Sequence, residues 1–186
     1  MLEKIFTSKN RIKMIEFLFF KKEESYIREI SKELNISTSV VKREVDNLIE
    51  VGILIKSGNK IIVNKKSIII DDLKNIFIKT EYIAYPLKDS LKNKEIEFAI
   101  IFGSFTKGSF NSESDVDLLV ITKLKASEIY KIIKPIEEKI KREINPVVWT
   151  KENLIKEKNS GFIKDVFKKK IIMIKGNENE LRKIIA

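Results

Sequence analysis

The sequence predicts two units of different architecture: an α+β unit over residues 1–68 and an α/β unit over residues 69–186. In the first unit, apolar residues recur at helical spacing and a hairpin signal follows them. In the second, short apolar runs alternate with amphipathic segments, which is typical of the strands and helices of an α/β unit. Between the two lies Lys65-Lys66-Ser67, a short polar joint.

Three helices are expected in the first unit. Either Ser8 or Asn10 can cap the first helix. The second helix is short, and after a tight turn at residues 35–37 the third begins, with Ser37 as a good N-cap. It ends at Val51-Gly52, where glycine suits the left-handed conformation that closes a helix. The three apolar faces consist of Ile12, Ile15, Leu18 and Phe19, of Ile27, Ile30 and Leu34, and of Val41, Val45, Leu48 and Ile49.

A hairpin is expected next, because the apolar runs 53–55 and 61–63 flank the turn sequence Ser57-Gly58-Asn59-Lys60. Helix, helix, turn, helix and hairpin, in this order, resembles the winged helix-turn-helix of ArsR- and MarR-like regulators. The resemblance covers residues up to about Asn64. It implies a DNA-binding domain whose third helix enters the major groove of double-stranded DNA.

The same resemblance implies which side chains meet DNA. Arg43 and Asn47 are one helical turn apart and would reach base edges, whereas Lys42 would meet a phosphate. Three acidic residues, Glu44 among them, dilute the positive surface of this helix, and contact with a protein or dimerisation is the alternative use of such a domain. The DNA-binding candidates are Ser37, Thr38, Ser39, Lys42, Arg43 and Asn47 on the helix, and Lys56, Asn59 and Lys60 on the wing.

A long helix is expected to open the second unit, from Asp71 or Asp72 toward Leu91, over about residues 71–92. Pro86 would kink or split it. Its apolar stripe would pack on the sheet or pair two copies of the chain, so a homodimer stays open.

Residues 98–122 contain the candidate catalytic and binding residues. An apolar run that reads as a buried strand ends at Gly103-Ser104, and after a polar loop a second strand opens with Asp115-Val116-Asp117. Because strand side chains alternate, Asp115 and Asp117 project from one face, where they repel each other unless a cation lies between them. Carboxylate oxygens suit Mg²⁺ or Mn²⁺. A Gly-Ser turn that leads into a helix offers backbone N–H groups to phosphates.

Gly-Ser, ten intervening residues and Asp-x-Asp resembles the signature of the DNA polymerase β nucleotidyltransferase superfamily, above all its minimal prokaryotic branch. Lys107-Gly108 fits the basic-glycine pair that follows Gly-Ser in that branch, and Ser114 fits the serine before the first aspartate. The motif covers about a tenth of the chain. The alternative is a polar loop between two core strands, with the aspartates capping the second.

The resemblance implies transfer of a nucleoside monophosphate from a nucleoside triphosphate to a hydroxyl, with release of pyrophosphate. Gly103 and Ser104 would hold the β- and γ-phosphates, with Lys107 as a charge partner. Asp115 and Asp117 would hold two Mg²⁺ ions.

The third strand departs from the family pattern. Active members place a third carboxylate there, as metal ligand and base, whereas this chain reads Arg142-Glu143-Ile144-Asn145-Pro146. Asn145 takes the equivalent position; it can bind a metal through its carbonyl oxygen but takes no proton at neutral pH. Glu143 shares its face and can substitute. Pro146 indicates an edge strand. Catalysis is therefore altered or lost, or else the register is shifted and Glu143 supplies the charge.

The remaining elements alternate helix and strand, which is consistent with the small mixed sheet that the superfamily resemblance implies. An amphipathic helix is expected over about residues 126–141, bent at Pro135, and the third strand over about 143–149. Thr150 opens another helix, residues 162–167 form a short helix, and residues 170–174 a last strand.

Composition excludes several classes of site. The chain has no cysteine and no histidine, so disulfides, thiolate zinc sites and imidazole bases are excluded, and acid–base chemistry falls to carboxylates, Lys or Tyr. A net charge of +10 favours an anionic partner such as nucleic acid or nucleotide. A start without signal-peptide layout and the lack of a long apolar run lead us to expect a cytoplasmic protein.

Three functions remain open. The first is a Mg²⁺-dependent nucleotidyltransferase coupled to DNA binding. The second is a winged-helix transcriptional regulator whose transferase domain senses a nucleotide, with reduced or no catalysis. The third is an antitoxin-like protein that acts on a partner protein, as some minimal nucleotidyltransferases do; those are usually single-domain, so the winged helix argues against it.

Overall fold

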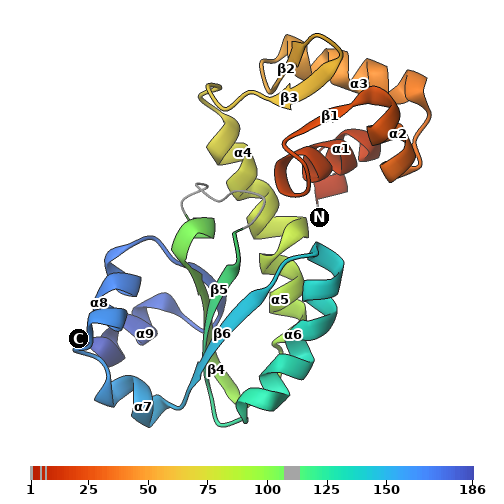
Figure 1. Cartoon of the computed structure of the whole chain (residues 1–186). Coiled ribbons are helices and arrows are strands. Elements are labelled where there is room, and N and C mark those ends of the chain that lie inside the picture. Colours follow the sequence, from red (N-terminus) through yellow and green to blue (C-terminus); the bar gives the residue numbers. More distant parts are fainter. Residues whose placement is uncertain (1, 5, 7, 107–113) are drawn as a thin grey trace. The chain divides into compact units, whose positions relative to one another are not determined.

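The structure is a computed structural model that describes residues 2–4, 6, 8–106 and 114–186. The chain divides into two compact units, Met1–Phe77 and Ile78–Ala186 (Figure 1). The division falls later than the expected one at residue 68, because helix α4 (Ile70–Phe77) packs with the first unit. The ring of Phe77 meets those of Phe19 and Phe20, with centroids 6.1 and 6.4 Å apart.

The first unit contains the three expected helices and the expected hairpin. A short third strand, β1, was not predicted, because Glu24-Ser25-Tyr26 buries only Ser25 and shows no apolar pattern. β1 pairs with β3, which gives the antiparallel order β1-β3-β2. The elements before α4 are a 3-10 turn η1 (Leu2–Lys4), α1 (Lys9–Phe20), β1 (Glu24–Tyr26), α2 (Ile27–Leu34), α3 (Thr38–Glu50), β2 (Leu54–Ser57) and β3 (Lys60–Val63).

The ends of these helices follow the capping signals in part. The Ser8 hydroxyl accepts a hydrogen bond from the Arg11 N–H at 3.1 Å, so Ser8, rather than Asn10, caps α1. Ser37 occupies the N-cap position of α3 but makes no capping hydrogen bond, so that part of the expectation is wrong. Gly52 takes the expected left-handed conformation after α3, with φ +73°. Gly58, φ +59°, does the same in the two-residue turn between β2 and β3.

A buried carboxylate joins α3 to α1. Glu44 is 4% exposed, accepts a hydrogen bond from the Ser8 hydroxyl at 2.9 Å and pairs with the Arg11 guanidinium at 2.8 Å. Burial by itself would raise the pKa of Glu44, but the hydrogen bonds from Arg11 and Ser8 and the charges of Arg11 and Arg43 outweigh it, so the pKa is lowered. The expectation that Glu44 dilutes the positive surface of α3 is therefore wrong, because this carboxylate faces inward.

The second unit is built on a small mixed sheet, as expected. The strand order is β6-β5-β4-β7, with β5 and β6 parallel and the other pairs antiparallel. β6, which contains Pro146, lies at an edge, also as expected. The elements are a π-helical turn η2 (Ile78–Tyr82), α5 (Ala84–Ser90), β4 (Ile96–Phe102), a 3-10 turn η3 (Gly103–Thr106), β5 (Val116–Thr122), α6 (Ala126–Ile140), β6 (Ile144–Trp149), α7 (Lys151–Lys156), α8 (Gly161–Lys168), β7 (Ile172–Lys175) and α9 (Glu178–Ile185).

The expected long helix is interrupted, but at a different place. The chain leaves the α-helical conformation at Ile78–Tyr82, whereas Pro86 lies in the first turn of α5. Proline is tolerated there because the first N–H groups of a helix have no intrahelical partner. Pro135 lies inside α6, and the helix continues through it.

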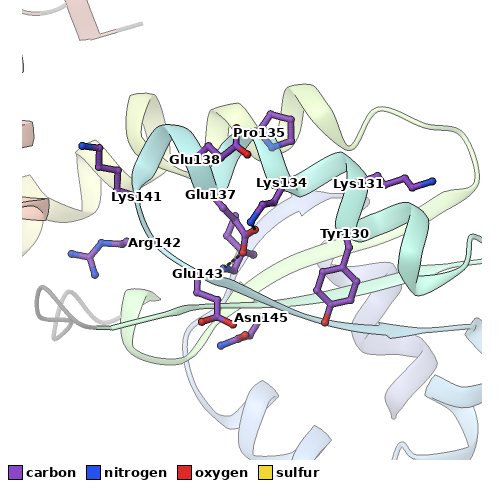
Figure 2. Close-up of a pocket in the computed structure, with 11 residues that line it drawn as sticks. Tyr130, Lys131, Lys134, Pro135, Glu137, Glu138, Lys141, Arg142, Glu143 and Asn145 are labelled. Atoms are coloured by element: carbon purple, nitrogen blue, oxygen red, sulfur yellow. Dashed lines mark hydrogen bonds and ion pairs between the residues drawn. The ribbon is translucent and has the colours of Figure 1, made fainter.

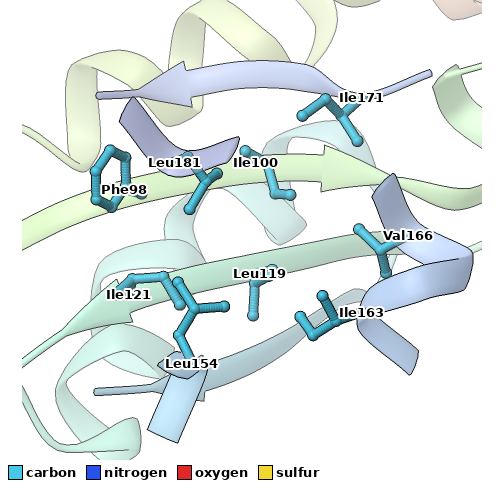
Figure 3. Close-up of a cluster of buried hydrophobic side chains, with 9 residues drawn as sticks. All are labelled: Phe98, Ile100, Leu119, Ile121, Leu154, Ile163, Val166, Ile171 and Leu181. Carbon is cyan, nitrogen blue, oxygen red and sulfur yellow. The ribbon is translucent and has the colours of Figure 1, made fainter. Parts of the chain in front are cut away.

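The sheet of the second unit is covered on both faces. Figure 1 shows α5 and α6 on one side and α7, α8 and α9 on the other. Alternation along β5 sends Val116, Leu118 and Val120 to the first side and Leu119 and Ile121 to the second. The buried cluster under α7–α9 consists of Phe98, Ile100, Leu119, Ile121, Leu154, Ile163, Val166, Ile171 and Leu181 (Figure 3).

The helices of the described residues include none with the length and apolar character that a membrane span needs.

The first prediction concerns the buried carboxylate of α3. Glu44→Gln keeps the side-chain volume but removes the charge that Arg11 and Ser8 bind, so near neutral pH we expect the free energy of unfolding to fall by about 1–3 kcal/mol. Because the folded-state pKa of Glu44 is lowered, its contribution is present above the ordinary value of 4.5 and is lost as pH falls through the folded pKa. Urea denaturation followed by circular dichroism at neutral and acidic pH measures both effects.

Glu50→Gln is the matched control, because Glu50 is exposed on the same helix. We expect it to change stability little at either pH. Equal losses in the two variants would contradict a stabilising role for the buried pair.

Candidate functional site

One row of residues crosses three strands at the end of the second sheet. Phe102 of β4 pairs with Asp117 of β5, and Asp117 pairs with Asn145 of β6. Paired residues on neighbouring strands project to the same face. Asp117 and Asn145 therefore lie side by side on the face that carries α7–α9, at the edge of the apolar cluster.

Asp115 joins this row from just before β5. Its side chain is exposed, and its Oδ2 accepts a hydrogen bond from Asn145 Nδ2 at 3.3 Å. The next residue, Val116, donates its N–H to the Glu143 carbonyl at 3.0 Å. The structure thus brings together the two aspartates and the asparagine that the sequence predicted at the third position.

Gly103 is required at its place for two reasons. Its φ is +77°, a conformation that L side chains rarely adopt. A Cβ at this position would stand 2.2 Å from Asp117 Oδ2, so a side chain would also displace the carboxylate. Where the sequence predicted a helix after Gly-Ser, the described residues form the single 3-10 turn η3, in which the Thr106 hydroxyl bonds the Gly103 carbonyl at 2.8 Å.

The two aspartates form an electrostatically unfavourable pair. Partial burial raises the pKa of Asp117, and the neighbouring charge of Asp115 raises it further. A divalent cation would remove this cost, and two carboxylates with an amide oxygen are the hard ligands that Mg²⁺ or Mn²⁺ prefers. Within the described ranges, no group of three or more acidic, His or Cys side chains is close enough to hold a metal.

The other predicted residues of the site lie nearby or outside the described ranges. Ser104 follows Gly103 in η3 and is half-buried, whereas Lys107 lies outside the described residues. Glu143 is exposed on the turn before β6. With Asn145 it lines a cavity of about 950 Å³ beside α6, in which Figure 2 shows the Tyr130 ring pointing from the helix toward the strand.

Two features of this region were not foreseen from the sequence. One is the cavity itself, to which α6 contributes Tyr130 and Lys134. The other is Arg142, 8% exposed, whose guanidinium donates to the Ser114 carbonyl at 2.8 Å. An isolated arginine between a helix and a strand gives no spacing signal, and only the packing shows that it is buried.

The predicted DNA-binding residues of the first unit are exposed, with two qualifications. Asn47 is half-buried and lines a cavity of about 530 Å³ with residues of α1 and α4. Lys60 pairs with Glu24 at 2.7 Å. Arg43 is 68% exposed. The remaining candidates on α3 and the wing, all exposed, are Ser37, Thr38, Ser39, Lys42, Lys56 and Asn59.

The second prediction tests the contact between Gly103 and Asp117. Gly103→Ala adds a methyl group where the carboxylate stands, so we expect a loss of about 2–4 kcal/mol in the stability of the second unit, from backbone strain and the displaced side chain together. Trp149 is the single tryptophan of the chain and lies in this unit, so its fluorescence in a denaturant titration reports the loss.

Gly58→Ala is the control that distinguishes backbone strain from a steric clash with a neighbouring side chain. Gly58 has a similar positive φ, +59°, but nothing lies within 4 Å of the place that an added methyl group would take. We expect a cost of about 1 kcal/mol, measured by hydrogen exchange in the first unit. A Gly103→Ala loss no larger than this would show that Asp117 moves aside freely.

Comparisons with known proteins identify a family for the second half of the chain. Residues 86–179, half of the chain, match the model of a family described as polymerase beta, nucleotidyltransferase. A comparison with curated proteins found no match. Among solved structures, a toxin–antitoxin with AMP-PNP has a TM-score of 0.43 and 11% identity over 55% of this chain and 81% of that chain.

Two further structures are similar at the same level. A mutant of the toxin–antitoxin MntA-HpeT has a TM-score of 0.40 and 13% identity, over 60% of this chain and 80% of that chain. The tri-AMPylated HEPN toxin of Shewanella oneidensis in complex with MNT antitoxin has a TM-score of 0.37 and 12% identity, over 62% and 80%. The assignment rests on the family match, which spans the Gly-Ser turn, both aspartates and Asn145. The chain belongs to the polymerase beta nucleotidyltransferase family.

Proposed function

We propose that the second unit transfers a nucleoside monophosphate from a nucleoside triphosphate to a hydroxyl-bearing acceptor. The observation that carries the proposal is the placement of Asp115 and Asp117 on one face at the start of β5, with Gly103 directly against Asp117 and Asn145 bonded to Asp115. Family membership supports the reaction class.

The two aspartates are the proposed ligands of the divalent cation, Mg²⁺ or Mn²⁺. When bound, the cation supplies positive charge that neutralises the aspartates and the phosphates of the substrate. The proposed phosphate contacts are the backbone N–H groups of Gly103 and Ser104, with Lys107 as a charge partner. Only Gly at position 103 leaves this turn close enough to Asp117 for phosphate and carboxylate to share one cation.

The acceptor is proposed to approach around the edge strand β6, from the cavity beside α6, because Glu143 and Asn145 both line this cavity. The acceptor oxygen forms a bond to the α-phosphorus as the bond between that phosphorus and pyrophosphate breaks. The hydroxyl proton needs a base, which Asn145 cannot be. Glu143, exposed at the mouth of the cavity, is the proposed proton acceptor.

The third prediction tests this assignment by mutation. With labelled nucleoside triphosphates, Mg²⁺ and cell lysate, the wild-type chain is expected to label an acceptor, and Asp117→Asn to lower labelling by a factor of about a hundred or more. Glu143→Gln is expected to cut the rate similarly if this carboxylate is the base. Asn145→Asp adds a second carboxylate without bulk; because Glu143 already takes the proton in this proposal, it is expected to change turnover little, and a large gain would mean that Glu143 is not the base.

Measurements of folding and of nucleotide binding are the controls for the labelling experiment. Asp117→Asn relieves like-charge repulsion, so its melting temperature without ligand is expected to equal or exceed that of wild type, while the gain from Mg²⁺ with ATP is lost. Wild type that binds nucleotide without labelling any acceptor would contradict transfer and favour a nucleotide sensor. Labelling of a protein band would identify a protein acceptor.

We also propose that the first unit is a winged helix that binds double-stranded DNA. The supporting observation is that Glu44 turns inward, so that two of the three acidic residues of α3, Asp46 and Glu50, remain exposed beside Lys42 and Arg43. Lys56 on β2 adds a positive charge on the hairpin. Nucleotide binding in the second unit would then alter DNA affinity if the chain is a regulator.

The fourth prediction concerns sequence reading by α3. Arg43→Ala is expected to weaken binding to a specific operator, such as the promoter of its own gene, by about 1–3 kcal/mol and to weaken binding to random duplex less. Fluorescence anisotropy over a range of salt concentrations measures both, because phosphate contacts make binding fall steeply with salt.

Lys13→Ala, an exposed cation on α1, is the control for net charge. It is expected to affect both duplexes little and equally. Equal losses on both duplexes for Arg43→Ala would make Arg43 a phosphate contact, and no binding to any duplex at low salt would favour contact with a protein.

A further inference from the structure

Arg142 is a buried arginine to which the proposed reaction gives no role. It lies in the turn between α6 and β6, directly after Lys141, whose φ of +53° closes the helix. The side chain is 8% exposed, and the Cζ of its guanidinium lies 5.5 Å from the centre of the Phe105 ring. Burial of such a strongly hydrated group is expensive unless its donors are satisfied.

The guanidinium donates in two directions. Nε donates to the Tyr82 hydroxyl at 2.9 Å, and Nη1 donates to the Ser114 carbonyl at 2.8 Å. The Tyr82 hydroxyl in turn donates to the Ile140 carbonyl at 3.2 Å. The Arg142 side chain thus contacts the segment before Asp115 and, through Phe105, the Gly-Ser turn. Through the Tyr82 hydroxyl it is linked to the end of α6.

These contacts bear on Asp115 through its backbone. The Ser114 carbonyl belongs to the peptide group that precedes Asp115, and Arg142 holds it. The following N–H, of Val116, is held by the Glu143 carbonyl at 3.0 Å. Asp115 is exposed. Among the described contacts, Arg142 and Glu143 hold the backbone on either side of it, and Asn145 donates to its carboxylate.

Arginine suits this task better than lysine does. Its planar fork donates along two edges at once while its face lies on an aromatic ring. A lysine ammonium keeps the charge, but it cannot reach Tyr82 and Ser114 with the same geometry. A loss of cation binding on exchange of Arg142 for lysine would therefore show the effect of the guanidinium geometry, because the positive charge is kept.

We propose that Arg142 is a positioning residue for the cation site. It holds the Ser114–Asp115 peptide and the Gly-Ser turn together, so that Asp115 and Asp117 present their carboxylates to one divalent cation. The inference rests on the proposed function in one respect, namely that these two aspartates bind such a cation.

The test uses Mn²⁺ alone as the probe, with binding measured by electron paramagnetic resonance on the full chain. Arg142→Lys is expected to weaken Mn²⁺ binding about tenfold or more, the usual size of an effect from a group that orients a metal ligand. Its melting temperature is expected to fall as well, because hydrogen bonds of the buried side chain are lost.

Tyr82→Phe is the matched control for stability. It removes the partner of Nε and the bond to the Ile140 carbonyl, but leaves the bond from Nη1 to the Ser114 carbonyl. We expect its melting temperature to fall while its Mn²⁺ affinity stays within about twofold of wild type. If Arg142→Lys does not fold, Phe105→Leu replaces it, because it removes the ring under the guanidinium and keeps an apolar side chain; a tenfold weakening is again expected.

The outcomes separate the two proposals. Wild type that binds no Mn²⁺ would overturn the cation site and, with it, this inference. Wild type that binds Mn²⁺, together with an Arg142→Lys variant that binds it equally well, would overturn the positioning role alone. Tyr82→Phe weakening Mn²⁺ binding as much as Arg142→Lys would show that Arg142 acts through general stability, which also overturns it.

Discussion

Repulsion between Asp115 and Asp117 is the constraint around which the end of the second sheet is organised. The two carboxylates share one face, and burial together with the Asp115 charge raises the pKa of Asp117. Three described neighbours of the pair add no negative charge: Gly103 has no side chain, Asn145 donates a hydrogen bond to Asp115, and Arg142 is a cation one peptide away. The pair is tolerated because its surroundings supply donors and space.

In each unit a buried charged side chain joins distant segments. Glu44 connects α3 to the start of α1 through Arg11 and Ser8, and Arg142 connects the Ser114 carbonyl to Tyr82. A buried charge adds little net stability, but leaving it without its partners is costly. Such groups therefore favour one arrangement over others. In the first unit this arrangement turns Arg43 outward, and in the second it fixes the backbone at Asp115.

The sequence predicted the periodic parts of the fold and the spaced parts of the site. Most helices with apolar stripes and most strands with apolar runs were predicted, because burial imposes their period. The last helix, α9, was missed, and the expected helix over 71–92 is divided into α4, η2 and α5. The proximity of Gly103, Asp115, Asp117 and Asn145 was predictable because motif spacing and strand alternation fix their faces. Elements without a period escaped: β1 has three residues with one inward side chain, and the π-helical turn at Ile78–Tyr82 follows from packing. The buried state of Glu44 and Arg142 escaped for the same reason, since charge alone predicts exposure.

In the proposed reaction, Asn145 contributes to nucleotide binding but not to proton removal during turnover. A third carboxylate would add a negative charge to a pair that already repels itself, whereas the amide of Asn145 donates to Asp115 and relieves part of that repulsion. Cation binding needs the two aspartates in place, and the amide supports them. Proton removal from an acceptor needs a group that can take the proton, which the amide is not. Under the proposed function, binding would depend on the row Asp115, Asp117 and Asn145. Turnover would depend on the cavity beside α6, where Glu143 is the carboxylate next to that row. Such a chain can bind a nucleotide whether or not it transfers the nucleoside monophosphate. Bound nucleotide therefore does not distinguish an enzyme from a sensor. The presence of a working proton acceptor does distinguish them.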